Sequence, residues 1–297
     1  MSNSREQPLV ALIGFLDTKL EEHILVQGKL KDLGCDVRMI DVSIRATSVD
    51  PARISVSIGP GAVRGVAKGL GAGIDRGTRT RADELDIMIA GATEVVLSYQ
   101  GREKLCGIMG LGGSTTTSTV TSVMRCLKIG LPKLVVSTMA SGDVSAYVGE
   151  SDITIMPSIG QYLYLHVKST RSSLCVYCGT VDISGKLNDI SIRVLKNACA
   201  AMAGMAHEYM KTFGEEVVQT TSAKRIAITM FGLTTPGVNA AMKHLTSFKD
   251  PSTGKELYDP VVFHATGSGG RTMERLVEEG VGLSAIWHAR CIKPDVQ

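Results

Sequence analysis

Residues 9–42 read LVALIGFLDTKLEEHILVQGKLKDLGCDVRMIDV and hold two apolar runs on either side of a helical pattern. The first run covers 9–16, and the second returns at Val37–Val42. Between them, apolar residues recur at helical spacing within 20–33, and Gly34 follows as a helix-ending residue. A strand, a helix and a strand joined within this length form a parallel, right-handed βαβ unit. Parallel sheets are covered by helices on both faces, so we predict the same alternation further along the chain.

The alternation continues and defines an N-terminal lobe over residues 1–220. The pattern predicts helices at 61–70, 80–99, 116–129 and 190–211, and strands at 106–109, 134–137 and 152–156. Residues 161–180 differ sharply from this background, because three of the seven tyrosines and two of the seven cysteines fall within them. We interpret 161–180 as an insertion.

A second βαβ-like pattern begins at Arg225, with strands at 226–230 and 260–264 and a helical pattern after each. We therefore predict an α/β protein of two Rossmann-like lobes with parallel sheets, the second lobe covering 221–297. The pattern is lost after Gly280, so we predict that the second lobe is truncated.

The amino-acid composition limits the classes of function that this chain can have. The 297 residues include 44% hydrophobic and 21% charged residues, which is typical of a chain that buries a substantial core. The net charge is only +3, and Lys and Arg are scattered, so we expect no nucleic acid partner. The sequence has neither a long apolar run nor a signal-like N-terminus, which predicts no membrane contact and a cytoplasmic location. The Cys175/Cys178 pair has no second pair at zinc spacing, and no metal site is predicted.

Residues 110–117, GLGGSTTT, lie between an apolar strand and a helical pattern. Such a turn presents free backbone N–H groups at the positive end of a helix dipole, its glycines let an anion approach, and its hydroxyls donate. We predict a phosphate-binding loop of Gly110, Gly112, Gly113, Ser114, Thr115, Thr116 and Thr117. The alternative is a plain strand-to-helix turn with an N-cap. The loop is neither a Walker loop nor a strict dinucleotide fingerprint, since Thr115 replaces the third glycine.

Polar residues at other strand ends could complete the same site, because open α/β sheets bind ligands at the carboxyl ends of their strands. The candidates are Asp17, Thr18 and Lys19 after the first strand, Asp41 at the end of the second, and Thr138, Ser141, Gly142 and Asp143 after a later one. The separation between Asp17 and Asp41 is about the one at which a doubly wound fold places an acid that hydrogen-bonds a ribose hydroxyl. Capping and solvated turns are the alternatives for these residues.

The second lobe repeats the plan of strand, glycines and helix. Its predicted ligand loop is Gly267, Ser268, Gly269, Gly270 and Arg271, in which the guanidinium suits a phosphate or carboxylate. His264 precedes this loop and is the only histidine that we consider as a catalytic acid or base, with a local hydrogen bond as the alternative. His23, His207 and His244 lie in helical patterns and are predicted to face solvent or lie at its boundary.

Five phrases in order resemble the ATP-binding domain family named for the tomato mosaic virus resistance protein. They are 14–19, 110–114, 136–143, 231–236 and 263–270, and the resemblance covers about 8–160 and 181–280. It implies two Rossmann-like lobes, ATP binding and homodimerisation. Three features depart from the family pattern: residues 161–180, which a retained intron or a gene-model error would explain, the tail after Gly280, and Thr115 with Thr116 in place of glycines.

The resemblance and the residues together favour an ATP-binding protein with a regulatory or protein-interacting role, and hence a protein partner. Mg²⁺ is an accompanying ion, for which Asp17 and Asp143 are the candidate ligands. One alternative is an ATP-dependent enzyme that acts on a small acidic metabolite in a cleft between the lobes. A further alternative is a dinucleotide-dependent oxidoreductase.

Overall fold

The computed structural model describes residues 6–45, 49–71, 80–102, 104–158, 161–164, 177–180, 187–212, 223–265, 267–279 and 283–288. The chain divides into two compact units. The first comprises Met1–Val148 and Asp152–Phe213, and the second comprises Gly149–Ser151 and Gly214–Gln297.

The first unit is built on a six-stranded sheet in the order β3-β2-β1-β4-β5-β6, and every pair of neighbouring strands is parallel. The strands are β1 (Leu9–Gly14), β2 (Asp36–Asp41), β3 (Val56–Ile58), β4 (Leu105–Gly112), β5 (Lys133–Ser137) and β6 (Thr154–Pro157). This order is that of a doubly wound Rossmann fold, whose direction reverses between β1 and β4. The predicted fold class is confirmed.

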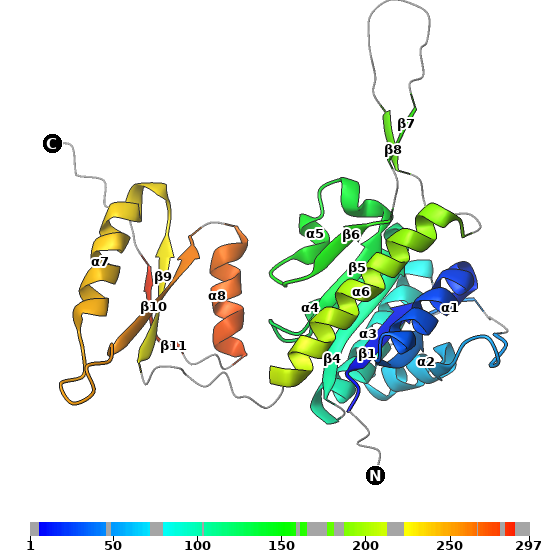
Figure 1. The fold of residues 1–297 in the computed structure, drawn as a ribbon, viewed down its shortest axis with the longest axis horizontal. Coiled ribbons are helices and arrows are strands. Elements are labelled where there is room, and N and C mark those ends of the chain that lie inside the picture. Colours follow the sequence, from blue (N-terminus) through cyan, green and yellow to red (C-terminus); the bar gives the residue numbers. More distant parts are fainter. Residues whose placement is uncertain are drawn as a thin grey trace, which may run out of the picture. The chain divides into compact units, whose positions relative to one another are not determined.

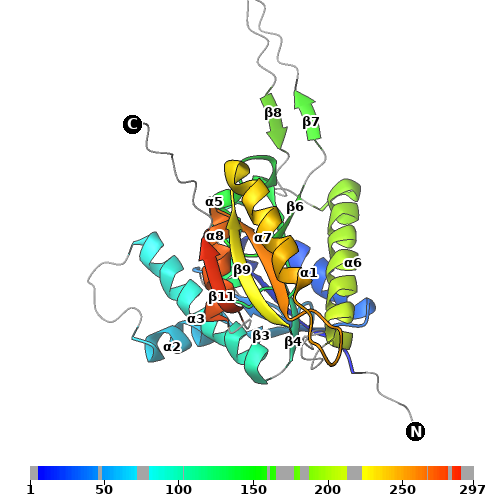
Figure 2. The same ribbon diagram turned by 90° about the vertical axis from the view of Figure 1, so that its left-hand side faces the viewer.

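Helices cover both faces of this sheet (Figures 1 and 2). One face carries α1 (Leu16–Asp32) and α6 (Asp189–Thr212), and the other carries α2 (Pro60–Gly69), α3 (Arg81–Arg102) and α4 (Ser114–Arg125). Successive side chains of β1 point alternately toward the helix layers on the two faces of the sheet. Ala11 and Ile13 pack toward α3 and α4, whereas Val10 and Leu12 pack toward α1 and α6, so β1 is buried on both sides.

The predicted eight-residue glycine loop is wrong in extent, because β4 continues to Gly112 and α4 begins at Ser114. Packing explains the glycines inside the strand. A Cβ at Gly110 would lie 2.6 Å from Cγ1 of Val120, and one at Gly112, where φ is +152°, would lie 2.5 Å from Oγ1 of Thr116. These two glycines let α4 lie close on β4.

A buried lysine fixes the start of β5. The Lys133 ammonium is fully enclosed and donates to the carbonyls of Lys128 (2.6 Å) and Leu131 (3.0 Å) and to Oδ1 of Asp152 (2.7 Å). The Gly130 amide donates to the other oxygen of that carboxylate at 2.7 Å. Burial alone would raise the pKa of Asp152, but the hydrogen bonds from Lys133 and Gly130 lower it overall.

Replacing Lys133 with Met should lower the free energy of unfolding by about 2 kcal/mol, because two buried carbonyls lose a charged donor. Lys128→Met, at an exposed position on the same loop, is the control and should change it by less than about 0.5 kcal/mol. A lowered pKa means that the Asp152 contribution is complete above its ordinary pKa of about 3.9 and is lost as pH falls further. The difference in the free energy of unfolding between wild type and Lys133→Met should therefore become smaller at acidic pH. Denaturant titrations that give the same free energy of unfolding for Lys133→Met and Lys128→Met would contradict this role of Lys133.

The second unit holds a three-stranded parallel sheet in the order β10-β9-β11. Its elements are β9 (Lys224–Met230), η2 (Gly232–Thr234), α7 (Thr235–Ser247), β10 (Tyr258–His264), α8 (Ser268–Glu278) and β11 (Leu283–His288). β11 lies in the tail where the sequence pattern was predicted to end, and that expectation was wrong for these six residues, since they pair with β9. The described part of this unit also exposes large apolar side chains, with Leu233 80% exposed and Phe231 49%.

The two ends of the predicted insertion pair with each other. β7 (Gln161–Tyr164) and β8 (Tyr177–Thr180) form an antiparallel two-stranded sheet that is separate from the six-stranded one. The segment between them, including Cys175, lies outside the described residues. In the part of the chain that the structure describes, no helix is long and apolar enough to cross a bilayer.

Candidate functional site

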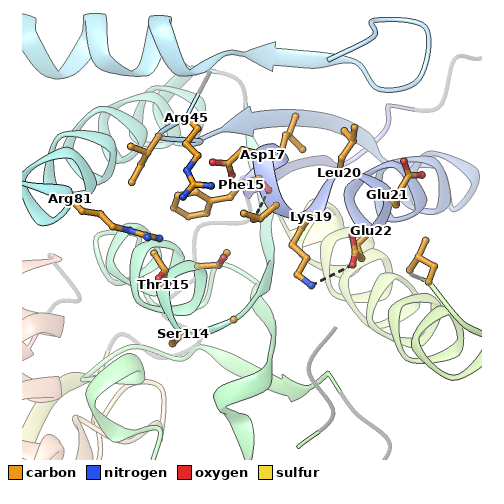
Figure 3. A pocket seen from close by; sticks show the side chains of 16 residues that line it. Phe15, Asp17, Lys19, Leu20, Glu21, Glu22, Arg45, Arg81, Ser114 and Thr115 are labelled. Carbon is orange, nitrogen blue, oxygen red and sulfur yellow. Dashed lines mark hydrogen bonds and ion pairs between the residues drawn. The ribbon is translucent and has the colours of Figure 1, made fainter. Parts of the chain in front are cut away.

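A pocket of about 1070 Å³ lies in the first unit, where the carboxyl ends of β1 and β4 meet (Figure 3). It is formed by the segment after β1, the segment after β2, and the first turns of α3 and α4. The lining residues are Phe15, Leu16, Asp17, Thr18, Lys19, Leu20, Glu21, Glu22, Ile44, Arg45, Arg81, Gly113, Ser114, Thr115, Thr116 and Leu187. Open α/β sheets bind ligands at this switch point between strands.

The N-terminus of α4 opens into the pocket with unused donors. The Thr117 amide makes the first helical bond, to the Gly113 carbonyl at 2.8 Å. The amides of Ser114, Thr115 and Thr116 precede it and have no acceptor among the described residues. Three N–H groups at the positive end of a twelve-residue helix form an anion-binding surface.

The N-terminus of α1, by contrast, is closed by the buried carboxylate of Asp41, which is 2% exposed. Its Oδ1 accepts from the Leu16 amide at 3.3 Å and from the hydroxyl of Ser43 at 2.5 Å. The Ser43 oxygen in turn accepts from the Asp17 amide at 3.1 Å. Asp41 therefore does not line the pocket, although its spacing predicted a ribose ligand. It holds the turn between β1 and α1.

The next two amides of α1 are also satisfied, since Thr18 and Lys19 both donate to the Phe15 carbonyl, at 3.3 and 3.0 Å. Lys19 then leaves the helical conformation (φ −134°, ψ 39°), so the chain kinks before the main part of α1 begins. All four first-turn amides of α1 thus have acceptors. Of the two helices, only α4 presents to the pocket first-turn amides that have no acceptor among the described residues.

The kink turns the Lys19 side chain toward the pocket, where it is 12% exposed and pairs with Glu22 at 3.6 Å (Figure 3). His23 supports the kink from below, as its Nδ1 donates to the Lys19 carbonyl at 2.6 Å. His23 was predicted to face solvent or to lie at its boundary, and it is fully buried instead. Burial lowers its pKa to about 4, so the ring is neutral at physiological pH. Gly14 is required beside it, because a Cβ there would lie 2.0 Å from Nε2.

Asp17 supplies a polar atom without a partner at the pocket. Its Oδ1 is enclosed, and no described group donates to it. The backbone amide of this residue is held by Ser43. A buried acceptor without a donor is costly unless a ligand supplies one.

Two arginines that the sequence analysis did not select also line the pocket. Arg45 follows β2, and Arg81 is the first residue of α3; both are exposed at its rim. Figure 3 shows them extending into the pocket from the side opposite Lys19. One local signal could have pointed to Arg81, because a cation at a helix N-terminus is disfavoured by the helix dipole.

Other predicted residues lie outside the pocket. They are Asp41, Gly110, Gly112, Thr117, Thr138, Ser141, Gly142 and Asp143. Thr117 instead joins helix α4 to strand β5, since its Oγ1 lies 2.6 Å from Oγ of Ser137. Asp143 caps the short helix α5 (Ser145–Val148) by accepting from the Ser145 amide at 2.9 Å. Hydrogen bonds from the side chain and then the amide of Ser145 lower the pKa of this carboxyl. Asp17 and Asp143, the two candidate ligands for Mg²⁺, therefore do not line the same pocket.

In the second unit the predicted loop has structural reasons for its glycines. Gly267 has φ +67°, and a Cβ at Gly269 would lie 2.3 Å from the His264 carbonyl, so α8 begins against the end of β10. The His264 ring is exposed and stacks edge-on against Phe231 with centroids 5.8 Å apart. Gly270 and Arg271 lie in the first turn of α8, and Arg271 is exposed. Ser268 begins this helix.

The fold and the pocket together define a doubly wound α/β protein with a candidate anion-binding site at its switch point. The chain belongs to the uncharacterised protein family UPF0261: the N-terminal domain of that family matches residues 8–164, and its C-terminal domain matches 223–286. The resemblance identified from the five sequence phrases is thereby confirmed, since relatives include the tomato resistance protein.

Relatives of two kinds are similar to this chain. A UPF0261 protein of Clostridium tetani is 32% identical over 276 residues, which cover 91% of this chain and 57% of the relative. The ToMV resistance protein Tm-1 of tomato (Solanum lycopersicum) is 40% identical over 190 residues, 64% of this chain and 21% of that protein. This chain thus spans little more than half of its bacterial relative.

Among solved structures, a putative UDP-N-acetylglucosamine 2-epimerase from Listeria monocytogenes is similar over 97% of this chain and 70% of its own. The TM-score is 0.33 and the sequence identity 11%, so this likeness carries no argument about function.

Proposed function

We propose that the first unit binds ATP in the switch-point pocket, with the phosphates on the N-terminus of α4. The observation that carries the proposal is the contrast between two helix ends at one pocket. The first turn of α4 presents the unused amides of Ser114, Thr115 and Thr116, whereas the first turn of α1 is closed. Phosphate groups bind well where free N–H groups and a helix dipole coincide.

The same contrast disfavours a dinucleotide-dependent oxidoreductase. In that class of protein the pyrophosphate lies on the helix after the first strand, and an acid after the second strand bonds the ribose. Here those amides are already bonded, and Asp41 is buried in holding the turn. The nucleotide is instead oriented from β4, with Lys19 near its phosphates.

Asp17 fits the remaining polar parts of such a ligand. Asp17 lines the pocket, and its carboxylate would either accept a hydrogen bond from a ribose hydroxyl or bind a Mg²⁺ ion that the phosphates also bind. The apolar lining from Phe15, Leu16, Ile44 and Leu187 suits the flat face of a base. The pocket volume of about 1070 Å³ accommodates a ligand of this size.

Titrating the full chain with ATP, ADP, AMP and NAD by calorimetry tests the proposal. We expect saturable binding that weakens from ATP to ADP to AMP, because fewer phosphate charges meet the α4 amides and Lys19. We expect NAD to bind at least 10-fold more weakly than ATP. Equal or tighter binding of NAD, or no heat with ATP, would contradict the proposal.

We further propose a regulatory or protein-interacting role for the bound nucleotide. The support is the tomato relative, which is named as a virus resistance protein. Homodimerisation and a cytoplasmic location stay predictions, and light scattering with and without ATP tests the first of them. An ATP-dependent release of ADP that needs an added small acid would favour an enzyme instead.

A further inference from the structure

A single non-helical residue near the start of α1 directs a charge toward the pocket. Lys19 has φ −134° and ψ 39°, and this ψ differs from the helical value of about −42° by roughly 80°. The Lys19 carbonyl is therefore turned away from the direction that carbonyls take in a regular helix. Because the chain kinks at this residue, its backbone conformation sets the direction in which the Lys19 side chain leaves the helix.

The imidazole of His23 bonds this turned carbonyl. Its Nδ1 lies 2.6 Å from the Lys19 oxygen, and since a carbonyl can only accept, Nδ1 carries the proton. The ring is fully buried. On its other edge, a Cβ at position 14 would lie 2.0 Å from Nε2, so the ring has room only because Gly14 ends β1. The imidazole is thus held between β1 and the kink, and its donor has a fixed place.

The Lys19 ammonium has little freedom once its backbone is fixed. Its side chain is 12% exposed, and Nζ lies 3.6 Å from Oε1 of Glu22, whose side chain is 6% exposed. Both residues line the pocket (Figure 3). An ammonium has three donors, and one carboxylate at this distance leaves donors for a ligand. The position of this charge at the pocket therefore depends on the backbone that His23 holds.

We infer that His23 is a positioning residue for the nucleotide: its hydrogen bond to the Lys19 carbonyl holds the kink and thereby keeps the Lys19 ammonium at the phosphates. This inference rests on the proposed function and extends it to a residue that does not line the pocket. A histidine that only stabilised the core would leave the contribution of Lys19 to binding unchanged.

A double-mutant cycle between residues 19 and 23 of the full chain tests the inference, with ATP affinity measured by calorimetry. Lys19→Met removes the charge and should weaken ATP binding about 10-fold. His23→Leu removes the donor from a side chain of similar size and should weaken ATP binding about 5-fold. The double variant should bind ATP at most about 2-fold more weakly than Lys19→Met alone, because the charge that His23 positions is already absent.

The conservative variant is His23→Asn. The asparagine amide stands near the place of Nδ1 and donates to the Lys19 carbonyl, so ATP affinity should stay within about 2-fold of wild type. Its smaller side chain leaves a cavity, so the stability of the fold should fall nevertheless. If affinity merely followed stability, His23→Asn would bind ATP as weakly as His23→Leu, and the inference would be overturned. Should His23→Leu not fold, His23→Gln replaces it in the cycle, since the longer amide reaches the place of Nε2 and misses the carbonyl.

His207→Leu is the matched control, since Nε2 of His207 bonds the Leu33 carbonyl at 3.0 Å, at the C-terminal end of α1. It removes a bond of the same kind far along the helix from the kink and should leave ATP affinity unchanged. The inference is overturned, while the proposed function stands, if the losses of Lys19→Met and His23→Leu multiply in the double variant. The same holds if either single variant binds ATP as wild type does. If wild type does not bind ATP, the proposed function itself fails.

Discussion

Replacing Ser114 with Asp should abolish most ATP binding while leaving the protein as stable as before. The carboxylate would stand at the first residue of α4, where the helix dipole favours an acid by about 0.3–1 kcal/mol. The same charge would repel a phosphate on the adjacent amides. Two unit charges about 4 Å apart at an effective dielectric of about 20 repel by roughly 4 kcal/mol. We therefore expect ATP affinity to fall by about 100-fold or more, measured by calorimetry.

The control places the same charge one turn further along. Ser118 is exposed on α4 but does not line the pocket, so Ser118→Asp should change ATP affinity by less than about 5-fold. Thermal unfolding of both variants tests the prediction that Ser114→Asp leaves the stability of the protein unchanged. Unchanged ATP binding in Ser114→Asp would show that the phosphates lie elsewhere. A large loss of stability would show that the change disturbs the fold and does not report on the site.

The second large effect concerns the packing of α2 on α3. Gly91 lies buried in the middle of α3, and a Cβ there would lie 2.1 Å from the carbonyl oxygen of Val63. Alanine favours helices over glycine by about 1 kcal/mol, but the two helices would have to separate to admit it. We expect Gly91→Ala to lower the free energy of unfolding of the first unit by about 3 kcal/mol, measured by denaturant titration.

The partner helix provides the opposite case. Gly65 is exposed in the middle of α2, and an added Cβ would meet nothing within 4 Å. Gly65→Ala should therefore raise stability by about 0.5–1 kcal/mol. Two identical substitutions on packed helices would then have effects of opposite sign. The same sign for both would contradict the close approach of α2 and α3 at Gly91.

The doubly wound sheet could be predicted because its signals are local. Five of the six strands of the first unit were predicted from short apolar runs, and apolar residues at helical spacing follow the first, as in Val10–Leu12 and then Leu20–Leu33. The three-residue strand β3 was not predicted. The boundary at the glycine loop was harder to place. Gly110 and Gly112 suggest a loop by composition, yet they belong to β4 because Val120 and Thr116 of α4 pack on them. No local sequence pattern shows whether a glycine allows a helix to pack closely or allows a ligand to approach the backbone.

The candidate site was predictable only in part, for a related reason. Lys19 and Ser114 both follow strands, and the topology brings their segments to the same pocket. The use of Asp41, by contrast, depends on a hydrogen bond to an amide 25 residues earlier, which residue spacing cannot reveal. Arg81 lies far along the chain from β1, so only the packing of α3 shows that it reaches the pocket.

A crystal structure of the full chain with ATP would locate the bound phosphates. We expect phosphate oxygens about 2.7–3.2 Å from the amide nitrogens of Ser114, Thr115 and Thr116, with the Asp41 carboxylate still bonded to the Leu16 amide. Phosphates seated instead on the first turn of α1, with Asp41 turned to a ribose, would contradict this expectation.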